Sequence, residues 1–476
     1  MSTFGNLLAF SPELWLFAGA LLVFLLARFA PGTTSTIALI AVAGAFLALA
    51  TQFKQTITIL DGAFTLDGFA IVVDVVLLAA AGLSLLASRA DLLPGESPAS
   101  AVPGFFLLAT LGAMMAVSAA EMISLFLSLE LLAVNLYVLT ALARRGAGAI
   151  SASLGYLVVG TASSGLLLYG LALVFGLSGE TNLSAAGRAL ASVNPNQAAA
   201  LLALSLLLGG LAFRMGLLPV RWWTRGFEVG IPLRVLIFVE SVGVVAALAV
   251  FGRFATATFS GTGIAYPAVI AAVAAVAMTA GNLLALTQTS LRRLLAYSSI
   301  AQAGFALMAF TDLKRVGISA LLVFLVALAL TTLGAFGTVV AYARSVHSDA
   351  IRDLAGMSRW SPALALALAV ALLSLAGLPP VAGFFGKLLV LQAAVDGGYA
   401  WLAVIGVANI VLAAFGYLRI IRTAFLDSPV FEVVPVRLDG GIRTTVGLAS
   451  IGIVFMGLLM GPLYAAASYG RAALLH

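Results

Sequence analysis

The residue of this sequence best placed to do chemistry is Lys387, which lies inside a hydrophobic segment. The stretch Ser374-Leu-Ala-Gly-Leu-Pro-Pro-Val-Ala-Gly-Phe-Phe-Gly-Lys387 is interrupted by two glycines and two prolines before the hydrophobic run resumes. In lipid, an unpaired backbone group costs several kcal/mol, so such a break is tolerated only inside protein or beside water. A lysine at membrane depth costs about 2.5–3.5 kcal/mol on insertion scales. The helix break and the lysine together predict an ion pathway. The alternative is a lysine that snorkels to the membrane surface, or a plain proline kink.

A second candidate site combines Glu130 with Arg214, each inside another hydrophobic segment. Asn135 and Tyr137, which follow Glu130, offer hydrogen-bond partners. An arginine stays charged at every accessible pH, so Arg214 can bias a nearby carboxyl group but cannot release a proton. We interpret Glu130 with its basic neighbour as a proton or coupling switch; the alternative is a static buried ion pair.

A polar stripe is the third feature, in the segment that follows the basic pair Arg292-Arg293. Tyr297, Ser298, Ser299 and Gln302 recur there at near-helical spacing. Small hydroxyl groups pack closely and form hydrogen bonds across membrane helices. The stripe therefore predicts either ordered water between helices or simple helix–helix adhesion, and the spacing favours neither.

Four further acidic residues lie in or near hydrophobic segments. Glu240 and Asp74 fall inside such segments, where each is either a further site or a partner of a nearby arginine. Glu13 and Glu121 lie near segment ends, which favours an interfacial position.

Composition decides which class of protein must hold these residues. Of 476 residues, 63% are hydrophobic and 9% are charged, which is far from a soluble globular chain. The absence of cysteine excludes disulfides and cysteine-ligated iron–sulfur or zinc sites, and His347 and His476 alone do not predict a histidine metal or haem site. The net charge of +6 needs no nucleic acid, because the arginines fall between hydrophobic segments. The sequence predicts a polytopic, all-α membrane protein.

Hydrophobic runs of membrane-spanning length recur along nearly the whole chain and predict about fourteen spans. The first is expected to be retained, because Met1–Phe10 lacks the basic start of a cleaved signal. The longest polar connections, Ser178–Asn196 and Asp427–Arg443, are predicted to be loops, which leaves no soluble domain. The predicted spans are 12–29, 35–53, 69–88, 102–118, 121–142, 150–177, 198–219, 231–251, 266–287, 294–310, 316–343, 362–395, 400–426 and 444–467.

The basic residues predict how these spans are oriented. Six of them, Arg253 included, fall on the side of the N-terminus and sixteen on the opposite side, while Arg214 and Lys387 fall within spans. Cytoplasmic loops carry the excess of Lys and Arg, so both termini are expected to face outward. This clear bias supports an even number of spans.

Two interrupted segments echo each other along the chain. Arg214-Met-Gly-Leu-Leu-Pro-Val220 in the seventh predicted span is similar to Ala376-Gly-Leu-Pro-Pro-Val381 in the twelfth. Paired broken helices at corresponding positions indicate inverted repeats with an ion route near the membrane midplane. Because the two segments lie five spans apart, the repeats would have opposite orientation.

Three motifs resemble the antiporter-like membrane subunits of respiratory complex I, most closely those of the subunit N type. They are Arg293-Leu-Leu-Ala-Tyr-Ser-Ser-Ile-Ala301, the Ser374–Lys387 stretch, and Leu129-Glu-Leu-Leu-Ala-Val-Asn-Leu-Tyr-Val-Leu139. The resemblance covers essentially the whole chain. It implies fourteen helices, two inverted five-helix repeats at about 102–251 and 266–426, broken seventh and twelfth helices, and proton translocation. The family's essential glutamate falls on Glu130 and its twelfth-helix lysine on Lys387.

The departures from the family pattern lie mostly in the first repeat. Arg214 stands where the family usually has lysine, and Gln302 where it usually has histidine; Gly155 and Val242 stand near two further lysine positions. The family's usual loop His-Phe-Trp-Thr-Pro-Asp is replaced in this chain by Arg221-Trp-Trp-Thr-Arg-Gly226, which has no histidine. Proton relay needs groups that titrate. The first half-channel is therefore expected to be impaired or rerouted, and the Lys387 half to be intact.

The resemblance implies a membrane-arm subunit of a complex I-type NADH–quinone oxidoreductase in a bacterial inner membrane. Its partners would be other membrane-arm subunits and lipid, with NADH, FMN, iron–sulfur clusters and quinone held by partner subunits and no cofactor or metal in this chain. The alternatives are a subunit of an Mrp-type cation/proton antiporter or of a membrane-bound hydrogenase, and a subunit that only braces the membrane arm. The predicted proton-handling residues are Glu130, Lys387, Arg214, Gln302, Tyr297, Ser298 and Glu240.

Overall fold

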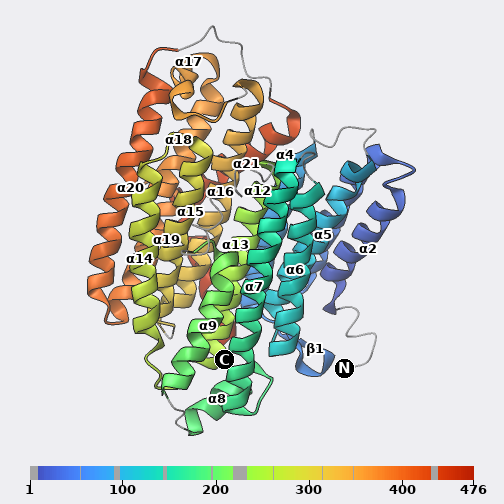
Figure 1. Ribbon diagram of the computed structural model, residues 1–476, viewed down its shortest axis with the longest axis vertical. Helices are drawn as coiled ribbons and strands as arrows, with labels where there is room; N and C mark the ends of the chain where they lie inside the picture. The colour runs from blue at the N-terminus through green and yellow to red at the C-terminus, as the bar shows by residue number, and fades with distance from the viewer. Residues whose placement is uncertain are drawn as a thin grey trace.

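The structure is a computed structural model of the 476-residue chain. It describes residues 9–53, 55–89, 97–142, 147–193, 197–217, 233–260, 262–313, 315–346, 348–429 and 438–475. Within these ranges the chain forms one bundle of helices that run up and down its long axis (Figure 1). Twelve of the described helices are long and apolar enough to cross a membrane, and two shorter apolar helices, Ser11–Leu26 and Pro362–Ala376, accompany them. The chain is a helical, polytopic membrane protein.

The helices follow the hydrophobic runs of the sequence closely. The first part of the chain forms α2 (Ser11–Leu26), α3 (Thr34–Thr51), α4 (Gly68–Ser88), α5 (Ser97–Ser118), α6 (Met122–Leu142), α7 (Ala147–Ser178), α9 (Gln197–Met215), α12 (Leu233–Phe238), the π-helical turn η4 (Val239–Gly243) and α13 (Val244–Thr258). The second part forms α14 (Tyr266–Leu286), α15 (Leu291–Met308), α16 (Gly317–Val346), α17 (Met357–Trp360), α18 (Pro362–Ala376), α19 (Ala382–Asp396), α20 (Ala400–Leu426), α21 (Gly440–Leu458) and α22 (Met460–Leu475).

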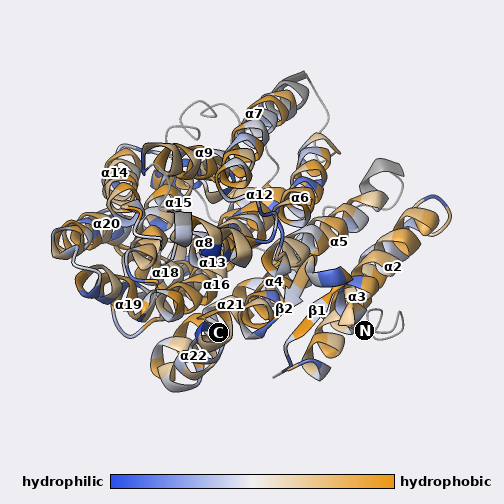
Figure 2. Cartoon of the chain, turned by 90° about the horizontal axis from the view of Figure 1, so that it is seen from below, coloured by the Kyte–Doolittle hydropathy of each residue, from blue (hydrophilic) through white to orange (hydrophobic). Residues whose placement is uncertain are grey.

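Small residues let neighbouring helices approach closely. Lipid tails are as apolar as leucine, so packing rather than hydrophobicity joins membrane helices. A Cβ added at Gly112 of α5 would lie 2.6 Å from the backbone nitrogen of Leu132 in α6. Gly210 of α9 similarly approaches the backbone of α7, and Gly281 of α14 that of α15. Three helix pairs are thus held at backbone contact. Helices α13 and α16, whose residues are mostly buried, lie near the middle of the end-on view (Figure 2).

Two connecting segments contain structure that the sequence analysis did not predict. A two-stranded antiparallel hairpin, β1 (Ile57–Ile59) and β2 (Phe64–Leu66), lies between α3 and α4, and its Ala63 carbonyl accepts a hydrogen bond from the backbone N–H of Ala120. The predicted loop Ser178–Asn196 contains α8 (Leu183–Val193), whose buried residues Leu183, Ala186 and Leu190 follow a helical period. That prediction was wrong because α8 is amphipathic and too short to read as a hydrophobic run.

The predicted span 444–467 is not one helix. The segment divides at Leu459 into α21 and α22, and α22 packs against α4 and α16. Pro462 explains the division, because it has no N–H to donate to the carbonyl of Leu458, four residues earlier. By contrast, the predicted interruption of the 362–395 segment is confirmed, since α18 ends at Ala376 and α19 begins at Ala382.

Candidate functional site

The break between α18 and α19 frees two backbone carbonyls inside the bundle. Gly377 ends α18 with a φ of +80°, and its N–H lies 3.0 Å from the carbonyls of both Leu373 and Ser374. In an uninterrupted helix the carbonyls of Leu375 and Ala376 would accept from residues 379 and 380. Both of those residues are prolines, which have no N–H. The two carbonyls therefore need donors from elsewhere in the fold.

Lys387 supplies one of these donors. Its Nζ lies 2.6 Å from the Leu375 carbonyl oxygen and 3.3 Å from that of Ala376. The ammonium group also lies 4.3 Å from the centre of the Phe305 ring, and the residue is only 1% exposed. A helix C-terminus carries partial negative charge, so the end of α18 stabilises this cation. The fold thus builds a buried site for one positive charge.

The polar stripe of α15 divides between two neighbours. Gln302 donates from Nε2 to the Leu375 carbonyl at 3.1 Å, so it shares an acceptor with Lys387. The Ser298 hydroxyl bonds the hydroxyl of Tyr417 in α20, while Ser299 bonds the Leu295 carbonyl of its own helix. Tyr297 is half-buried and packs against the hydrophobic core. The structure therefore brings Gln302 to Lys387 and uses Ser298 to join α15 to α20.

A small cavity lies next to the lysine site. Its volume is about 10 Å³, and Gln302, Thr331, Ser374 and Gly383 contribute to its lining. The Ser374 and Thr331 hydroxyl oxygens are 2.7 Å apart, and Ser374 accepts from the N–H of Gly383 at 3.1 Å. This volume and this set of polar groups suit about one water molecule. Sequence reasoning missed Thr331 as a partner, because a single threonine within α16 carries no pattern of its own.

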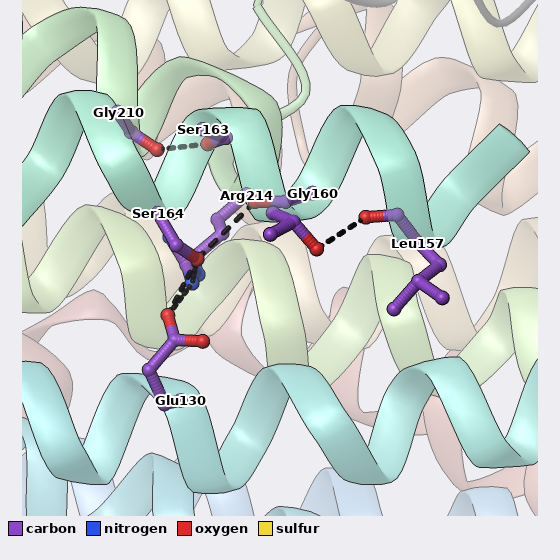
Figure 3. A network of polar contacts seen from close by, with 8 residues as sticks. Glu130, Leu157, Gly160, Ser163, Ser164, Gly210 and Arg214 are labelled. Carbon is purple, nitrogen blue, oxygen red and sulfur yellow. Dashed lines mark hydrogen bonds and ion pairs between the residues drawn. The ribbon is translucent and has the colours of Figure 1, made fainter.

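The expected contact between Glu130 and Arg214 is present. Arg214 Nη2 in α9 lies 2.7 Å from Glu130 Oε1 in α6, and the Ser164 hydroxyl in α7 donates to the same oxygen at 2.5 Å (Figure 3). Arg214 also donates to Ser164 at 2.9 Å. Three helices meet at this ion pair. Ser164 was not among the predicted site residues, although the Ser163-Ser164 pair in an apolar helix was an available signal.

The surroundings of the ion pair differ from what was expected for Glu130. Asn135 donates to the Leu131 carbonyl of its own helix at 2.7 Å, so its predicted role as a partner of Glu130 is wrong. The Tyr137 ring packs edge-on against Tyr156 at 5.2 Å between centroids. The Arg214 side chain is 7% exposed and that of Glu130 27%. Arg214 Nη1 is buried without a hydrogen-bond partner among the described residues.

The positions that depart from the family pattern offer no replacement base. Gly155 lies exposed on α7, where an added Cβ would meet nothing within 4 Å. Val242 is fully buried in η4. Glu240 is also buried in η4, which packs against α4 and α16. The carboxylate that pairs with Arg214 is that of Glu130, and Arg214 also contacts the side chain of Ser164. The loop 221–226 and the histidines His347 and His476 lie outside the described residues.

A second buried ion pair was not predicted. Arg253 Nη2 lies 2.7 Å from Asp67 Oδ1, and both side chains are almost fully buried. Asp67 also caps α4 by accepting from the Ala70 N–H at 2.9 Å. Arg253 was assigned to a loop because its span was predicted to end at residue 251, but α13 continues to Thr258. Only the fold reveals that two residues so distant in sequence neutralise each other.

Two other carboxyl groups are buried more deeply than expected. Glu13, which was predicted to be interfacial, is only 7% exposed in the first turn of α2. Asp74 in α4 is fully buried, and within the described part of the chain neither carboxylate oxygen has a hydrogen-bond partner. The described residues contain no group of three or more His, Cys, Asp or Glu side chains that could hold a metal ion.

The two candidate sites share one design but differ in their cation. In each, a helix ends at a left-handed glycine close to a basic residue: Gly216 (φ +75°) follows α9, which carries Arg214, and Gly377 (φ +80°) follows α18, beside Lys387. Arginine keeps its charge at every accessible pH, whereas a buried lysine can exist in both charged and neutral forms. The first site therefore holds a permanent charge, whereas the second holds a cation of a type that can titrate.

Comparison with known proteins gives consistent relationships. Residues 119–413 match the family model of the NADH:quinone oxidoreductase/Mrp antiporter transmembrane region. A protein of Anaeromyxobacter sp. (strain Fw109-5) named NADH-quinone oxidoreductase subunit N is 33% identical over 95% of this chain and 94% of its own length. The match therefore extends beyond the family model to nearly the whole chain.

Solved structures match the fold along almost its full length. A chain of the Thermus thermophilus respiratory complex I with bound aureothin superposes with a TM-score of 0.82 at 28% identity, covering 95% of this chain and 98% of that one. A chain of the Mrp complex of Dietzia sp. DQ12-45-1b gives a TM-score of 0.87 at 20% identity over 99% and 98%. At that identity the second likeness concerns the fold alone.

Proposed function

The chain belongs to the NADH:quinone oxidoreductase/Mrp antiporter transmembrane family, and we propose that it is the subunit N-type membrane-arm subunit of a complex I-type NADH–quinone oxidoreductase. The name of the Anaeromyxobacter relative and the likeness to a complex I chain support this role. Electron transfer from NADH through FMN and iron–sulfur clusters to quinone would then occur in partner subunits. The contribution of this chain would be proton translocation.

The observation that carries the proposal is the position of Lys387 on two carbonyls freed by a helix break. The carbonyls and the C-terminal end of α18 stabilise the charged lysine. A change in nearby charge would alter that stabilisation and so load or unload the lysine. A water in the cavity beside Ser374 and Thr331 would receive the proton.

We assign a different role to the Glu130 site. Arg214 would act as a fixed positive charge beside Glu130, with Ser164 holding the two groups together. Proton traffic would be concentrated in the second half of the chain, because Gly155 and Val242 add no titratable group to the first half. In this scheme the first half senses charge and the second half moves protons.

We further infer fourteen membrane spans in two inverted repeats at about 102–251 and 266–426. The paired breaks after Arg214 and before Lys387 support this arrangement. With the basic side in the cytoplasm of a bacterium, both termini would face outward.

The orientation can be tested by labelling single cysteines in this otherwise cysteine-free chain. Helix α7 separates Ala147 from Ser184, which lies in α8 at the lower end of the view (Figure 1). We expect a cysteine at position 147 to react from the cytoplasmic side and one at 184 from the outside. Labelling from the reverse sides would disprove the orientation.

Gln302 provides a test of the lysine site that leaves the lysine in place. Gln302→Leu removes one donor to the Leu375 carbonyl, and a hydrogen bond contributes about 1 kcal/mol net, so we expect about a fivefold loss of coupled pumping. Ser299→Ala is the matched control on α15, since Ser299 bonds only its own helix. Equal effects of both variants would show that Gln302 has no special part in pumping.

A cation/proton antiporter of the Mrp type is the second candidate, and the match of residues 119–413 to a family model that includes Mrp antiporters favours it. The two candidates differ in their partners. Purification of the assembly from its native membrane should yield subunits that hold flavin and iron–sulfur clusters and that reduce quinone with NADH. An assembly without flavin that exchanges cations for protons would establish the alternative.

A further inference from the structure

A groove between α18 and α21 lies outside both candidate sites. It has a volume of about 680 Å³ and is lined almost wholly by apolar side chains. The lining begins with Ala363 on α18 and Arg443 on α21, and it continues along α21 to Phe455 and Leu458. Such a volume is typical of small-molecule binding sites, which measure about 300–1,000 Å³.

The groove exists because small residues face it from both helices. Ala363 and Ala367 lie one turn apart on α18, and Gly447 and Ser450 lie one turn apart on α21. A Cβ added at Gly447 would meet nothing within 4 Å. In membrane proteins, facing stripes of small residues normally allow two helices to close on each other. Here the space between them stays open, so it is available to a ligand.

One end of the groove is positively charged. Arg443 is exposed in the first turns of α21, and it is the one basic residue in the described lining. Helices α18 and α21 run in the same direction, since Gly457, near the end of α21, packs against the Pro380 carbonyl just after α18. Their N-termini therefore lie at the same end as Arg443, and both carry partial positive charge. Asp439 opposes this charge in part, but its carboxylate already caps the Gly441 N–H at 3.2 Å.

We propose that this groove binds a membrane glycerophospholipid with an anionic headgroup. The phosphate and headgroup would lie at Arg443 and the two helix N-termini, and one acyl chain would lie along α21. The helix from Arg443 to Leu458 spans about 22 Å at the helical rise, and one leaflet of the hydrocarbon core is about 15 Å thick. The groove is thus long enough to hold an acyl chain whose headgroup remains at the surface.

A lipid fits this groove better than a helix from a partner subunit. An apolar helix gains no hydrophobic free energy by leaving lipid, so it needs close packing along a regular face. The groove alternates small residues with projecting ones such as Leu366, Ile451 and Phe455. A flexible acyl chain adapts to that irregular surface, and an anionic headgroup complements Arg443.

The proposal can be tested on the assembly purified from its native membrane, without reference to its pumping activity. The purified assembly would be equilibrated with vesicles of dioleoylphosphatidylglycerol or of dioleoylphosphatidylcholine and then stripped gradually with detergent. Native mass spectrometry would count the retained lipids. We expect one phosphatidylglycerol to be retained at least fivefold better than phosphatidylcholine, with cryo-EM density for it between α18 and α21.

Two variants separate headgroup from chain recognition. Arg443→Gln should abolish the preference for phosphatidylglycerol, whereas Arg419→Gln, at an exposed arginine of α20 outside the groove, should not. Gly447→Leu should fill the open space and reduce retention of both lipids, whereas Gly461→Leu, at another open glycine, should not. An unchanged preference in Arg443→Gln, equal retention of the two lipids, or density of a partner subunit in the groove would overturn the proposal.

Discussion

Replacing Lys387 with methionine should reduce redox-coupled proton pumping by the assembled enzyme at least tenfold, while the chain still inserts and assembles. Methionine keeps the length and apolar stem of lysine but cannot carry a proton. It also leaves the Leu375 and Ala376 carbonyls without the ammonium donor that lies 2.6 Å and 3.3 Å away. Pumping would be measured in vesicles by the quenching of a pH-sensitive dye, together with NADH–quinone turnover.

Two further variants decide what the lysine contributes. Lys387→Arg keeps the charge but does not release a proton. Pumping that stays low in Lys387→Arg would show that titration of the lysine is required, whereas recovery would show that its charge is sufficient. Leu388→Met, at the exposed neighbouring position, controls for the substitution itself. Pumping at the wild-type level in Lys387→Met would reduce the lysine to a structural element.

Glu130→Gln should lower turnover strongly, because it leaves the Arg214 charge buried without its carboxylate. Removal of one partner from a buried ion pair typically costs about 3–5 kcal/mol, and the Arg214 side chain is only 7% exposed. The variant Glu121→Gln, at the start of the same span, should behave as wild type. Turnover, pumping and the thermal stability of the assembly would be measured for each.

A double-mutant cycle distinguishes a switch from a static ion pair. If the pair is only structural, combining Glu130→Gln with Arg214→Met should restore both stability and turnover, since no charge is left unpaired. If Glu130 is a coupling switch, the double variant should regain stability but not turnover. Recovery of both properties would therefore count against the coupling role.

Arg214→Lys, compared with Lys387→Met, tests which half of the chain carries protons. If traffic is concentrated around Lys387, then Arg214→Lys should leave pumping close to that of the wild type. A high-resolution map of ordered water should show hydration around Lys387, Ser374 and Thr331, where the cavity of about 10 Å³ lies. A continuous water chain past Glu130 and Arg214, with a dry Lys387 region, would show that the active half has been assigned in reverse.

The sequence by itself determined the class of protein and the positions of most of its helices. Hydrophobic length is a local property, so long apolar runs such as 316–343 predicted helices without knowledge of their neighbours. The break before Lys387 was equally visible, because two adjacent prolines flanked by glycines leave helix carbonyls without N–H donors. Local signals failed where an element was short or amphipathic, as in β1–β2 and α8, or where one proline divided a long run, as at Leu459.

The partners of each functional residue were decided only by the tertiary structure. The packing of α15, α18 and α19 decides that Lys387 donates to the Leu375 carbonyl and that Gln302 donates to the same oxygen. Ser164 reaches Glu130 from another helix, and Asp67 meets Arg253 across 186 residues of sequence. These pairs leave no periodic trace along the chain. Helical repeats record which side of one helix is apolar, whereas a polar contact between helices depends on the packing of both, which no single segment encodes.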